Sequence, residues 1–383
     1  MGPHRRVEWP MTLPNRRSLP TSLSVAAARA HLPRSGPLWP GARFTHEHRA
    51  QALRRGLRFI YRVATAPRNF EIYGDDFLWC FHSLSATTAD PWIRREARRM
   101  GQERARQWRH DFRRLPARAS ALDVGSWVFG SIAAECLNVH DERLRRTLER
   151  AVGKFTPADF LLFDPAKEPV PRDVPDDCAS CQTPNRRGRR LCRKCGSRLR
   201  MFNRYEVMID ALVTAYTGEC SGIPLGSSLA GVMGKLAMLR PYRGPHGGSH
   251  RGYIDLAYAI THVVYALNDY GLYRLRPSWL PQEFAFLKAN LRQSIADNDP
   301  ETTGEFLDTL KAFGLTEADP VIRAGMDFVL SRQHPDGSWG EPEKGDCYTP
   351  YHATWTAIGG LMEYAYRGER TRYPDALRRA QRG

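Results

Sequence analysis

Segments with one polar face alternate along this chain with segments that are apolar nearly all round. Helices with an Arg- and Glu-rich face are predicted at 46–65, 91–113, 141–154, 226–240, 281–297 and 320–333. Between them lie apolar helices near 75–88, 121–139, 202–220, 252–270, 301–314 and 349–367. A helix with a charged face lies at the periphery of a fold, and one that is apolar all round is buried. The alternation therefore predicts an all-α protein, an (α/α)6 toroid with six inner and six outer helices.

Two stretches interrupt this alternation. Residues 156–200 are rich in proline and contain a cluster of cysteines, which indicates an insertion between toroid helices. Residues 1–45 are rich in Arg and Pro and are predicted to form a basic, disordered tail. The toroid is therefore expected at 46–155 and 201–370, and residues 371–383 are predicted to form a short basic C-terminal tail.

The cysteine cluster has the spacing of a zinc ribbon. Two residues separate Cys178 from Cys181, and two separate Cys192 from Cys195. Two Cys-x2-Cys turns can offer four thiolates to one tetrahedral zinc, and four such ligands leave no position open to substrate. We therefore predict a structural zinc, with iron in a rubredoxin-like site as the alternative. The other four cysteines are scattered, which favours a reducing cytoplasm over a disulfide framework.

The net charge of +16 is unevenly distributed. Residues 1–45 carry +6 and residues 178–200 carry +8, so the remaining residues together carry +2. Basic segments bind nucleic acid through its phosphates and can also bind acidic partners. We expect such binding to be weak and non-specific and to involve residues 1–45 and 178–200. No apolar run approaches the roughly 18 residues needed to span a bilayer, so the sequence predicts a cytoplasmic protein without a transmembrane segment.

A short segment near the C-terminal end resembles a known repeat. Gln333, Gly337 and Trp339 have the spacing Gln-x3-Gly-x-Trp, which resembles the QW motif of the terpenoid cyclase and protein prenyltransferase (squalene-cyclase-like) superfamily. The resemblance implies an α/α toroid in which the motif joins an outer helix to an inner one. It also implies a central cavity for a hydrophobic substrate of isoprenoid type. The Asp-x-Asp-Asp and Asp-Asp-x-x-Asp motifs of that superfamily are missing from this sequence. We therefore do not expect the standard mechanisms of the superfamily here.

Polar residues recur at helical spacing inside the apolar segments. Such spacing brings side chains to one face of a helix. The sets are Asp75, Trp79 and His82; Ser131, Glu135 and Asn138; Glu206, Asp210, Thr214 and Thr217; Asp255, Tyr258 and His262; Glu301, Glu305 and Asp308; and His352, Trp355 and Thr356. Any one of them alone would be interpreted as a hydrogen-bonded core residue. Six coordinated sets predict a polar cavity at the centre of the toroid.

The first functional hypothesis is a cyclase- or prenyltransferase-like enzyme that acts on a hydrophobic small molecule in this cavity. Its predicted catalytic residues are Asp255, His262, Glu305 and His352, which supply acid, base or ligand groups. Its predicted substrate-binding residues are Trp79, Tyr205, Asp210, Tyr258 and Trp355, and the aromatic faces among them would stabilise a cationic intermediate.

Two other hypotheses remain open at this point. In one, the cavity holds a second metal, zinc or iron, bound by His262, His352 and one or two carboxylates. For this site we expect the two imidazoles to converge, with Asp255 or Glu305 within hydrogen-bonding distance. In the other, the protein is a non-enzymatic binding protein that acts through its basic zinc ribbon.

Overall fold

The computed structural model describes residues 36–181, 183–245, 249–341 and 347–382, and these are mostly helical. The helices at the predicted outer positions are α1 (His46–Thr65), α3 (Pro91–Asp111), α5 (Glu142–Val152), α8 (Leu229–Met233), α10 (Pro281–Ala296) and α12 (Pro320–Ser331). Those at the predicted inner positions are α2 (Pro67–Thr87), α4 (Ala121–Cys136), α7 (Arg204–Ser221), α9 (His250–Leu267), α11 (Pro300–Ala312) and α13 (Tyr348–Leu361). The all-α prediction is confirmed for this part of the chain.

The structure differs from the sequence prediction at several boundaries. α2 begins at Pro67, and α8 is a short helix followed by a 3-10 turn, η2 (Leu236–Leu239). α13 ends at Leu361, whereas the sequence predicted helix to 367. Part of the predicted C-terminal tail forms α14 (Pro374–Gln381), which packs against α8. Of the predicted N-terminal tail, residues 1–35 lie outside the described residues.

Several helices begin where an acidic cap precedes a proline. The carboxylate of Asp90 accepts hydrogen bonds from the backbone N–H groups of Trp92 and Ile93 at 2.7 and 3.0 Å. Asp319 caps α12 in the same way through Val321 N, at 3.0 Å. A cap satisfies amide groups that the first helical turn leaves unpaired, and proline is tolerated there because it has no amide to lose.

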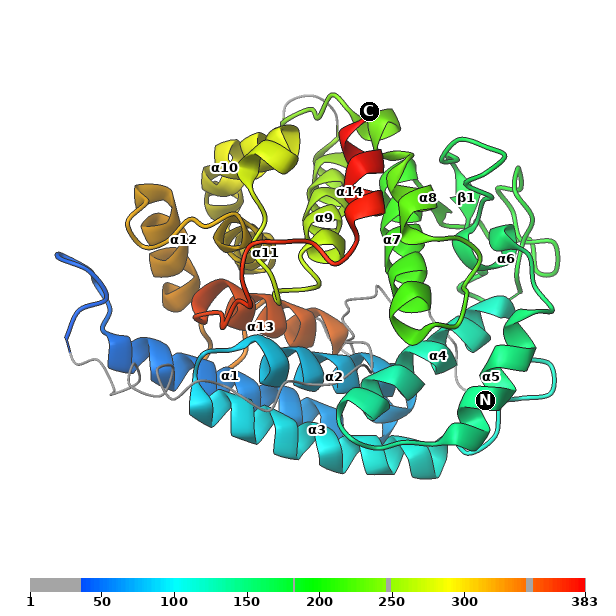
Figure 1. Cartoon of the computed structure of the whole chain (residues 1–383), viewed down its shortest axis with the longest axis horizontal. Helices are drawn as coiled ribbons and strands as arrows, with labels where there is room; N and C mark the ends of the chain where they lie inside the picture. The colour runs from blue at the N-terminus through cyan, green and yellow to red at the C-terminus, as the bar shows by residue number, and fades with distance from the viewer. Residues whose placement is uncertain (1–35, 182, 246–248, 342–346, 383) are drawn as a thin grey trace.

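The inner helices contact one another in sequence order. α2 packs against α4, α4 against α7, α7 against α9, α9 against α11, and α11 against α13. α13 returns to α2 through an edge-to-face contact between Tyr351 and Phe77, whose ring centroids are 4.5 Å apart. In Figure 1, α1, α2 and α3 run across the lower half of the molecule, and α7 and α9 stand upright above them.

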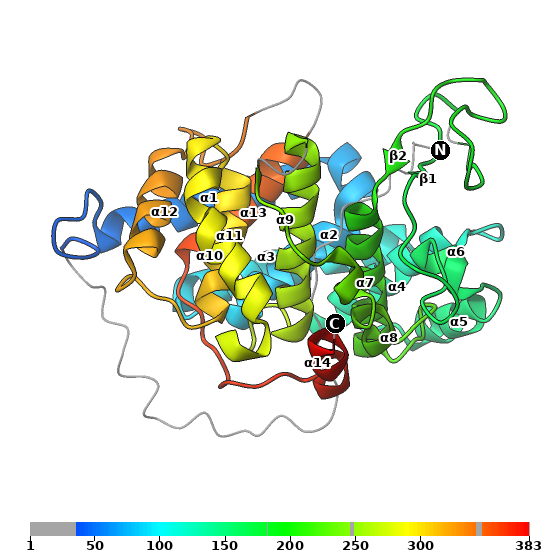
Figure 2. The same ribbon diagram turned by 90° about the horizontal axis from the view of Figure 1, so that it is seen from above.

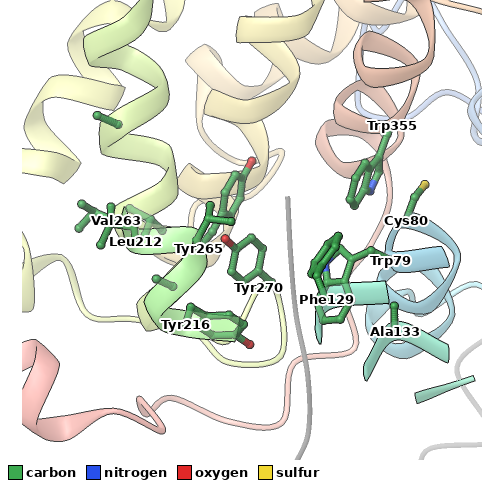
Figure 3. Packing of buried hydrophobic residues seen from close by; sticks show 14 of the residues in the cluster. Trp79, Cys80, Phe129, Ala133, Leu212, Tyr216, Val263, Tyr265, Tyr270 and Trp355 are labelled. Atoms are coloured by element: carbon green, nitrogen blue, oxygen red, sulfur yellow. The ribbon is translucent and has the colours of Figure 1, made fainter. Parts of the chain in front are cut away.

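One large cluster of buried apolar side chains unites these helices. Figure 3 shows Trp79, Phe129 and Trp355 on one side of the centre of the cluster and Tyr216, Tyr265 and Tyr270 on the other. The rings of Trp79 and Phe129 are 5.0 Å apart, which joins α2 to α4. Within the described residues, no helix is both long and apolar enough to cross a membrane.

The cysteine cluster lies in a small unit outside this core. Strand β1 (Val174–Pro175) pairs antiparallel with β2 (Met201–Phe202) and closes a loop that we call the cysteine module, residues 174–202. Before it, α6 (Pro157–Leu161) packs against α4 and α7. Figure 2 shows β1 and β2 at the edge of the molecule, on the side of α6 and α7.

The Gln-x3-Gly-x-Trp segment connects three helices. The amide of Gln333 donates to the backbone oxygens of Ala52 in α1 and of Gly337, at 2.8 and 3.0 Å. The fully buried indole of Trp339 donates to Val329 O in α12 at 2.7 Å, and its backbone N–H donates to Thr354 Oγ1 in α13 at 3.0 Å. Gly337 has φ +95°, and a Cβ there would come within 2.7 Å of a backbone oxygen of α1. This position therefore requires glycine.

Candidate functional site

A small pocket with an internal volume of about 40 Å³, open in part to solvent, lies where α2, α9, α11 and α13 meet. We call it the α11/α13 pocket. Its lining residues are Ser83, Leu84, Tyr265, Tyr270, Glu305, Asp308, His352, Trp355, Thr356, Gly359, Met362 and Tyr364. Aromatic rings and apolar side chains make up half of this wall, and two carboxyl groups and one imidazole provide its ionisable groups. A concave, largely aromatic site with a few convergent polar groups is typical of small-molecule binding.

An acid–imidazole pair stands at one side of the pocket. His352 Nδ1 lies 2.6 Å from Glu301 Oε1, and the hydroxyl of Tyr258 donates to the same oxygen at 2.7 Å. Burial alone would lower the pKa of His352, but the charge and hydrogen bond of Glu301 outweigh it and raise this pKa to about 9. His352 is therefore an imidazolium at neutral pH, and Glu301 is its counter-ion.

Glu305 lies one helical turn after Glu301, on the same face of α11. Its side chain is buried, with 2% of the residue exposed, and accepts a hydrogen bond from Thr261 Oγ1 at 2.5 Å. Burial raises the pKa of Glu305 to about 8, although the charge of His352 and the hydrogen bond from Thr261 act in the opposite direction. At neutral pH this pocket residue is therefore mostly a neutral carboxylic acid.

Asp308 is the second carboxyl group of the pocket and has a different environment. Burial raises its pKa to about 6, and the nearby charge of Lys311 limits the rise. The ammonium of Lys311 donates to the backbone oxygens of Gly359, Gly360 and Met362 at 3.0, 2.8 and 2.7 Å. Burial in turn lowers the pKa of Lys311 to about 8. Asp308 is thus mostly ionised at neutral pH, one turn of α11 away from a protonated Glu305.

A third acid, Asp76, lies outside the pocket, on α2. It is fully buried, and neither of its carboxylate oxygens has a hydrogen-bond partner among the described residues. Burial raises its pKa well above the ordinary value, whereas the charge of His352 lowers it. A carboxyl group without partners is least costly to bury in its neutral form.

Three of the predicted catalytic and substrate-binding residues line this pocket, namely Glu305, His352 and Trp355, and so do Asp308 and Thr356 of the predicted polar sets. A fourth, Tyr258, is connected to it through Glu301. Asp255 lies elsewhere, near the start of α7, where it accepts a hydrogen bond from Asn203 Nδ2 at 2.6 Å. The structure therefore does not bring Asp255 together with the acids of α11.

Four further predicted residues are not among those that line the pocket. His262 Nδ1 lies 2.8 Å from Tyr258 O of its own helix, and the expected convergence of His262 with His352 stays a prediction. Trp79 is fully buried between Phe129 and other core residues. Tyr205 contacts the guanidinium of its neighbour Arg204 at the start of α7, and Asp210 lies half-buried on the same helix.

The sequence prediction missed several tyrosines of the pocket wall. Tyr265 lies seven residues after Tyr258, on the face of α9 that approaches α11, so helical spacing alone could have indicated it. Tyr270 and Tyr364 come from segments that follow α9 and α13. No local signal marks them, because their position depends on how those segments return across the core.

The four cysteines of the module form a candidate metal centre. Their sulfur atoms all lie within 4.8 Å of one another, and Cys178 Sγ is 3.5 Å from Cys195 Sγ. Four sulfurs around one zinc at tetrahedral geometry would be separated by about 3.8 Å, so the spacing fits a single ion. The backbone amides of Cys195 and Lys194 lower the pKa of the Cys192 thiol to about 6, which favours the thiolate that a metal requires.

The predicted second metal has less geometric support. Within the described ranges, the four cysteines form the one group of three or more His, Cys, Asp or Glu side chains whose ligand atoms all lie within 4.8 Å of one another. The acids of α11 and His352 do not form such a group. A second metal in the cavity therefore stays a prediction of the sequence.

Comparison of the chain with models of protein families, with curated proteins and with solved structures finds no match. Any functional assignment therefore depends on the residues of the pocket and of the cysteine module themselves.

Proposed function

We propose that this protein is an enzyme that moves protons on a largely apolar small molecule bound in the α11/α13 pocket. The observation that carries the proposal is the contrast between Glu305 and Asp308, which lie one turn apart on α11 and both line the pocket. Their pKa values of about 8 and about 6 lie on opposite sides of neutrality. A pair of carboxyl groups separated in this way provides one acid and one base at the same pH.

In the proposed reaction, Glu305 donates its proton to one atom of the substrate and Asp308 accepts a proton from another. The substrate is then isomerised or undergoes elimination or addition, and the two carboxyl groups exchange their protonation states. The imidazolium of His352 stabilises negative charge that develops beside Glu305. Because Glu301 holds His352 by a hydrogen bond and is itself held by the hydroxyl of Tyr258, this positive charge is already oriented before substrate binds.

The pKa of Glu305 also limits the kind of substrate. An acid with a pKa of about 8 is weaker than an ordinary carboxylic acid and is poorly suited to protonating an isolated alkene. It is better matched to a carbonyl or enol oxygen, whose protonation in the transition state needs an acid with a pKa near the working pH. We therefore favour an apolar molecule with an oxygen function over a pure hydrocarbon.

The helix contacts support the (α/α)6 toroid as the architecture of this enzyme. Each inner helix contacts the next, and the Tyr351–Phe77 contact closes the series from α13 to α2. The Gln333 and Trp339 hydrogen bonds join an outer to an inner helix, as the resemblance to the terpenoid cyclase superfamily implies. In this proposal the resemblance concerns the fold and the apolar substrate, and the acid–base groups are those of this chain.

The sulfur geometry supports a structural zinc held by Cys178, Cys181, Cys192 and Cys195. All four positions of a tetrahedral ion would be filled by these thiolates, so zinc there would stabilise the fold of the module and would take no part in the reaction.

Deuterium incorporation can test the proposed chemistry before the substrate is identified. The protein is incubated in D₂O with a library of apolar oxygenated metabolites, and mass spectrometry detects compounds that gain deuterium or change structure. Glu305→Gln and Asp308→Asn should each reduce the rate by about 100- to 10,000-fold. Asp255→Asn is the matched control, because this carboxylate lies outside the pocket, and it should retain activity. Activity that survives Glu305→Gln and is lost in Asp255→Asn would contradict the proposal.

A further inference from the structure

The nearly neutral body of the protein contains a strongly basic region. Residues 91–118, which comprise α3 and the segment after it, hold ten Arg against three acidic residues, a net charge of +7. α1 holds five Arg against Glu47 alone, a net charge of +4. The rest of the body outside the tail and the cysteine module is therefore net negative. The net charge of +2 outside the tail and the cysteine module is therefore a sum of two strongly basic segments and an acidic remainder.

The two basic helices lie side by side and run in the same direction. Arg54 of α1 stacks over Trp92 of α3 at 5.2 Å, and about two turns later in α1 and three turns later in α3 the Tyr61 hydroxyl donates to Glu103 at 2.6 Å. Figure 1 shows α1 and α3 next to each other along the lower edge of the molecule. α3 has 21 residues, so it extends about 32 Å at 1.5 Å per residue.

Part of this positive charge is paired, and part is not. Arg99 pairs with Glu96 and Glu103, and Arg109 pairs with Asp141. Nine of the other arginines are exposed and have no ion-pair partner among the described residues. We call six of them, namely Arg58, Arg95, Arg98, Arg106, Arg113 and Arg114, the α1/α3 basic face; the other three are Arg55, Arg94 and Arg118. Arg95 and Arg106 are eleven residues apart, which places them on the same side of α3.

We propose that the α1/α3 basic face binds the phosphate backbone of double-stranded nucleic acid. Guanidinium groups are suited to phosphate because their planar donors match its oxygens. One turn of a DNA duplex is about 34 Å long, so a rigid helix of about 32 Å that lies along the duplex can reach the phosphates that border its grooves over one turn. Binding would depend on charge and shape and would not depend on base sequence.

The side chains on this face favour a duplex over the other polyanions. A single strand is usually bound by stacking its bases on open aromatic rings, but Trp92 is covered by Arg54 and Arg58. A membrane surface is usually bound with apolar side chains that enter the lipid. The exposed large apolar residues of the described chain are Leu191 and Met238, and both lie outside α1 and α3.

The test is a salt titration of binding by the full chain to a fluorescent duplex of mixed sequence. The variant Arg95→Gln/Arg98→Gln/Arg106→Gln removes three charges from the α1/α3 basic face. Each phosphate contact contributes about 0.9 to the slope of log K against log salt, so the slope should fall by about 3. The matched control Arg186→Gln/Arg189→Gln/Arg193→Gln removes three charges from the cysteine module, where we expect only weak binding, and should lower the slope by less than about 1.

Circular dichroism melting verifies that both variants are folded, which is expected because the substituted side chains are exposed. The proposal is overturned if the control lowers the slope and the α3 variant does not, because binding would then belong to the module. It is also overturned if the chain prefers a single strand of the same length. Binding to vesicles containing phosphatidylserine, without binding to the duplex, would assign the face to a membrane instead.

Discussion

The helical body and the cysteine module of this chain are held together in different ways. The body has one apolar cluster that extends from α1 to α14, with Trp79, Trp108 and Trp339 fully buried in it. Between its two strands the buried apolar set of the module is Cys178, Cys192 and Leu199, and Val174 and Phe202 of the strands belong to the cluster of the body. A unit this small cannot bury enough apolar surface to offset the entropy of ordering its backbone. We therefore expect the module to depend on a bound metal for its stability and the body to depend on its apolar cluster.

The two regions also treat their ionisable groups differently. In the module, backbone amides lower the pKa of the Cys192 thiol to about 6, so this one ligand is prepared in its charged form, although burial raises the pKa of Cys178 to about 11. In the α11/α13 pocket, burial raises the pKa of Glu305 to about 8, so an acid is kept in its neutral form. Peptide dipoles directed at a group stabilise its charge, and removal of water destabilises it. The first arrangement suits metal binding and the second suits proton transfer.

The largest expected effect comes from removing a metal ligand. Cys192→Ser should abolish stoichiometric metal binding, measured by elemental analysis, because structural zinc contributes about 10–16 kcal/mol to the folding of small zinc domains. The module should become sensitive to protease while the helical circular dichroism signal is retained. Cys136→Ser is the control and should keep the metal, since Cys136 lies outside the cluster. Loss of the whole helical signal in Cys192→Ser would show that the body also depends on the module.

A large effect is expected within the body at Trp339. Trp339→Ala removes a fully buried ring and its hydrogen bond to Val329, and it should lower the free energy of unfolding by about 3–5 kcal/mol. Trp279→Ala is the matched control, because this indole is only partly buried, and it should cost less than half as much. Denaturant melts compare the two. Equal losses of unfolding free energy in the two variants would mean that Trp339 stabilises the body no more than a partly buried tryptophan does.

The pocket should make the stability of the body dependent on pH. Glu305 has a pKa of about 8 when folded against an ordinary 4.5, so the folded state binds more protons between these values. Its contribution is therefore present below pH 4.5 and is lost as the pH rises toward 8. The pKa of His352 is raised from 6.5 to about 9, so His352 also stabilises the folded state at low pH, and this stabilisation is lost as the pH rises from 6.5 to 9. Thermal melts should show stability falling over this interval, and Glu305→Gln should flatten the lower part of the fall.

The smallest expected effect concerns an exposed ion pair of the body. Arg99 pairs with Glu96 and Glu103 on the surface of α3. Pairs of this kind contribute about 0.3–0.5 kcal/mol, so Arg99→Gln should barely change a denaturant melt. A loss comparable to that of Trp339→Ala would indicate that charge, and not apolar burial, holds this side of the body.

The sequence predicted the helices well because their periodicity is local. The position of α11 and its row of Glu301, Glu305 and Asp308 follows from helical spacing alone. Long-range contacts explain the misses. α13 ends at Leu361, where the ammonium of Lys311 on another helix pairs with the backbone oxygens of Gly359, Gly360 and Met362.

The site was predicted only in part for the same reason. Asp255 and His262 have the correct spacing for a common helical face, yet Asp255 bonds to Asn203 and His262 to its own backbone. Helical spacing gives the side of a helix but not the neighbour that this side faces. The choice between α11 and α7 as the partner of α9 residues is made by packing, to which a single sequence offers no guide.

The most direct test of the proposed site is the protonation state of Glu305. Carbon-13 NMR of protein labelled at its glutamate carboxyl groups, with Glu305→Gln for assignment, follows the titration of this one group. We predict a carboxyl resonance that titrates with a pKa of about 8 and is still protonated at neutral pH. A Glu305 resonance that titrates near the ordinary value of 4.5 would contradict the assignment of this residue as the acid of the pocket.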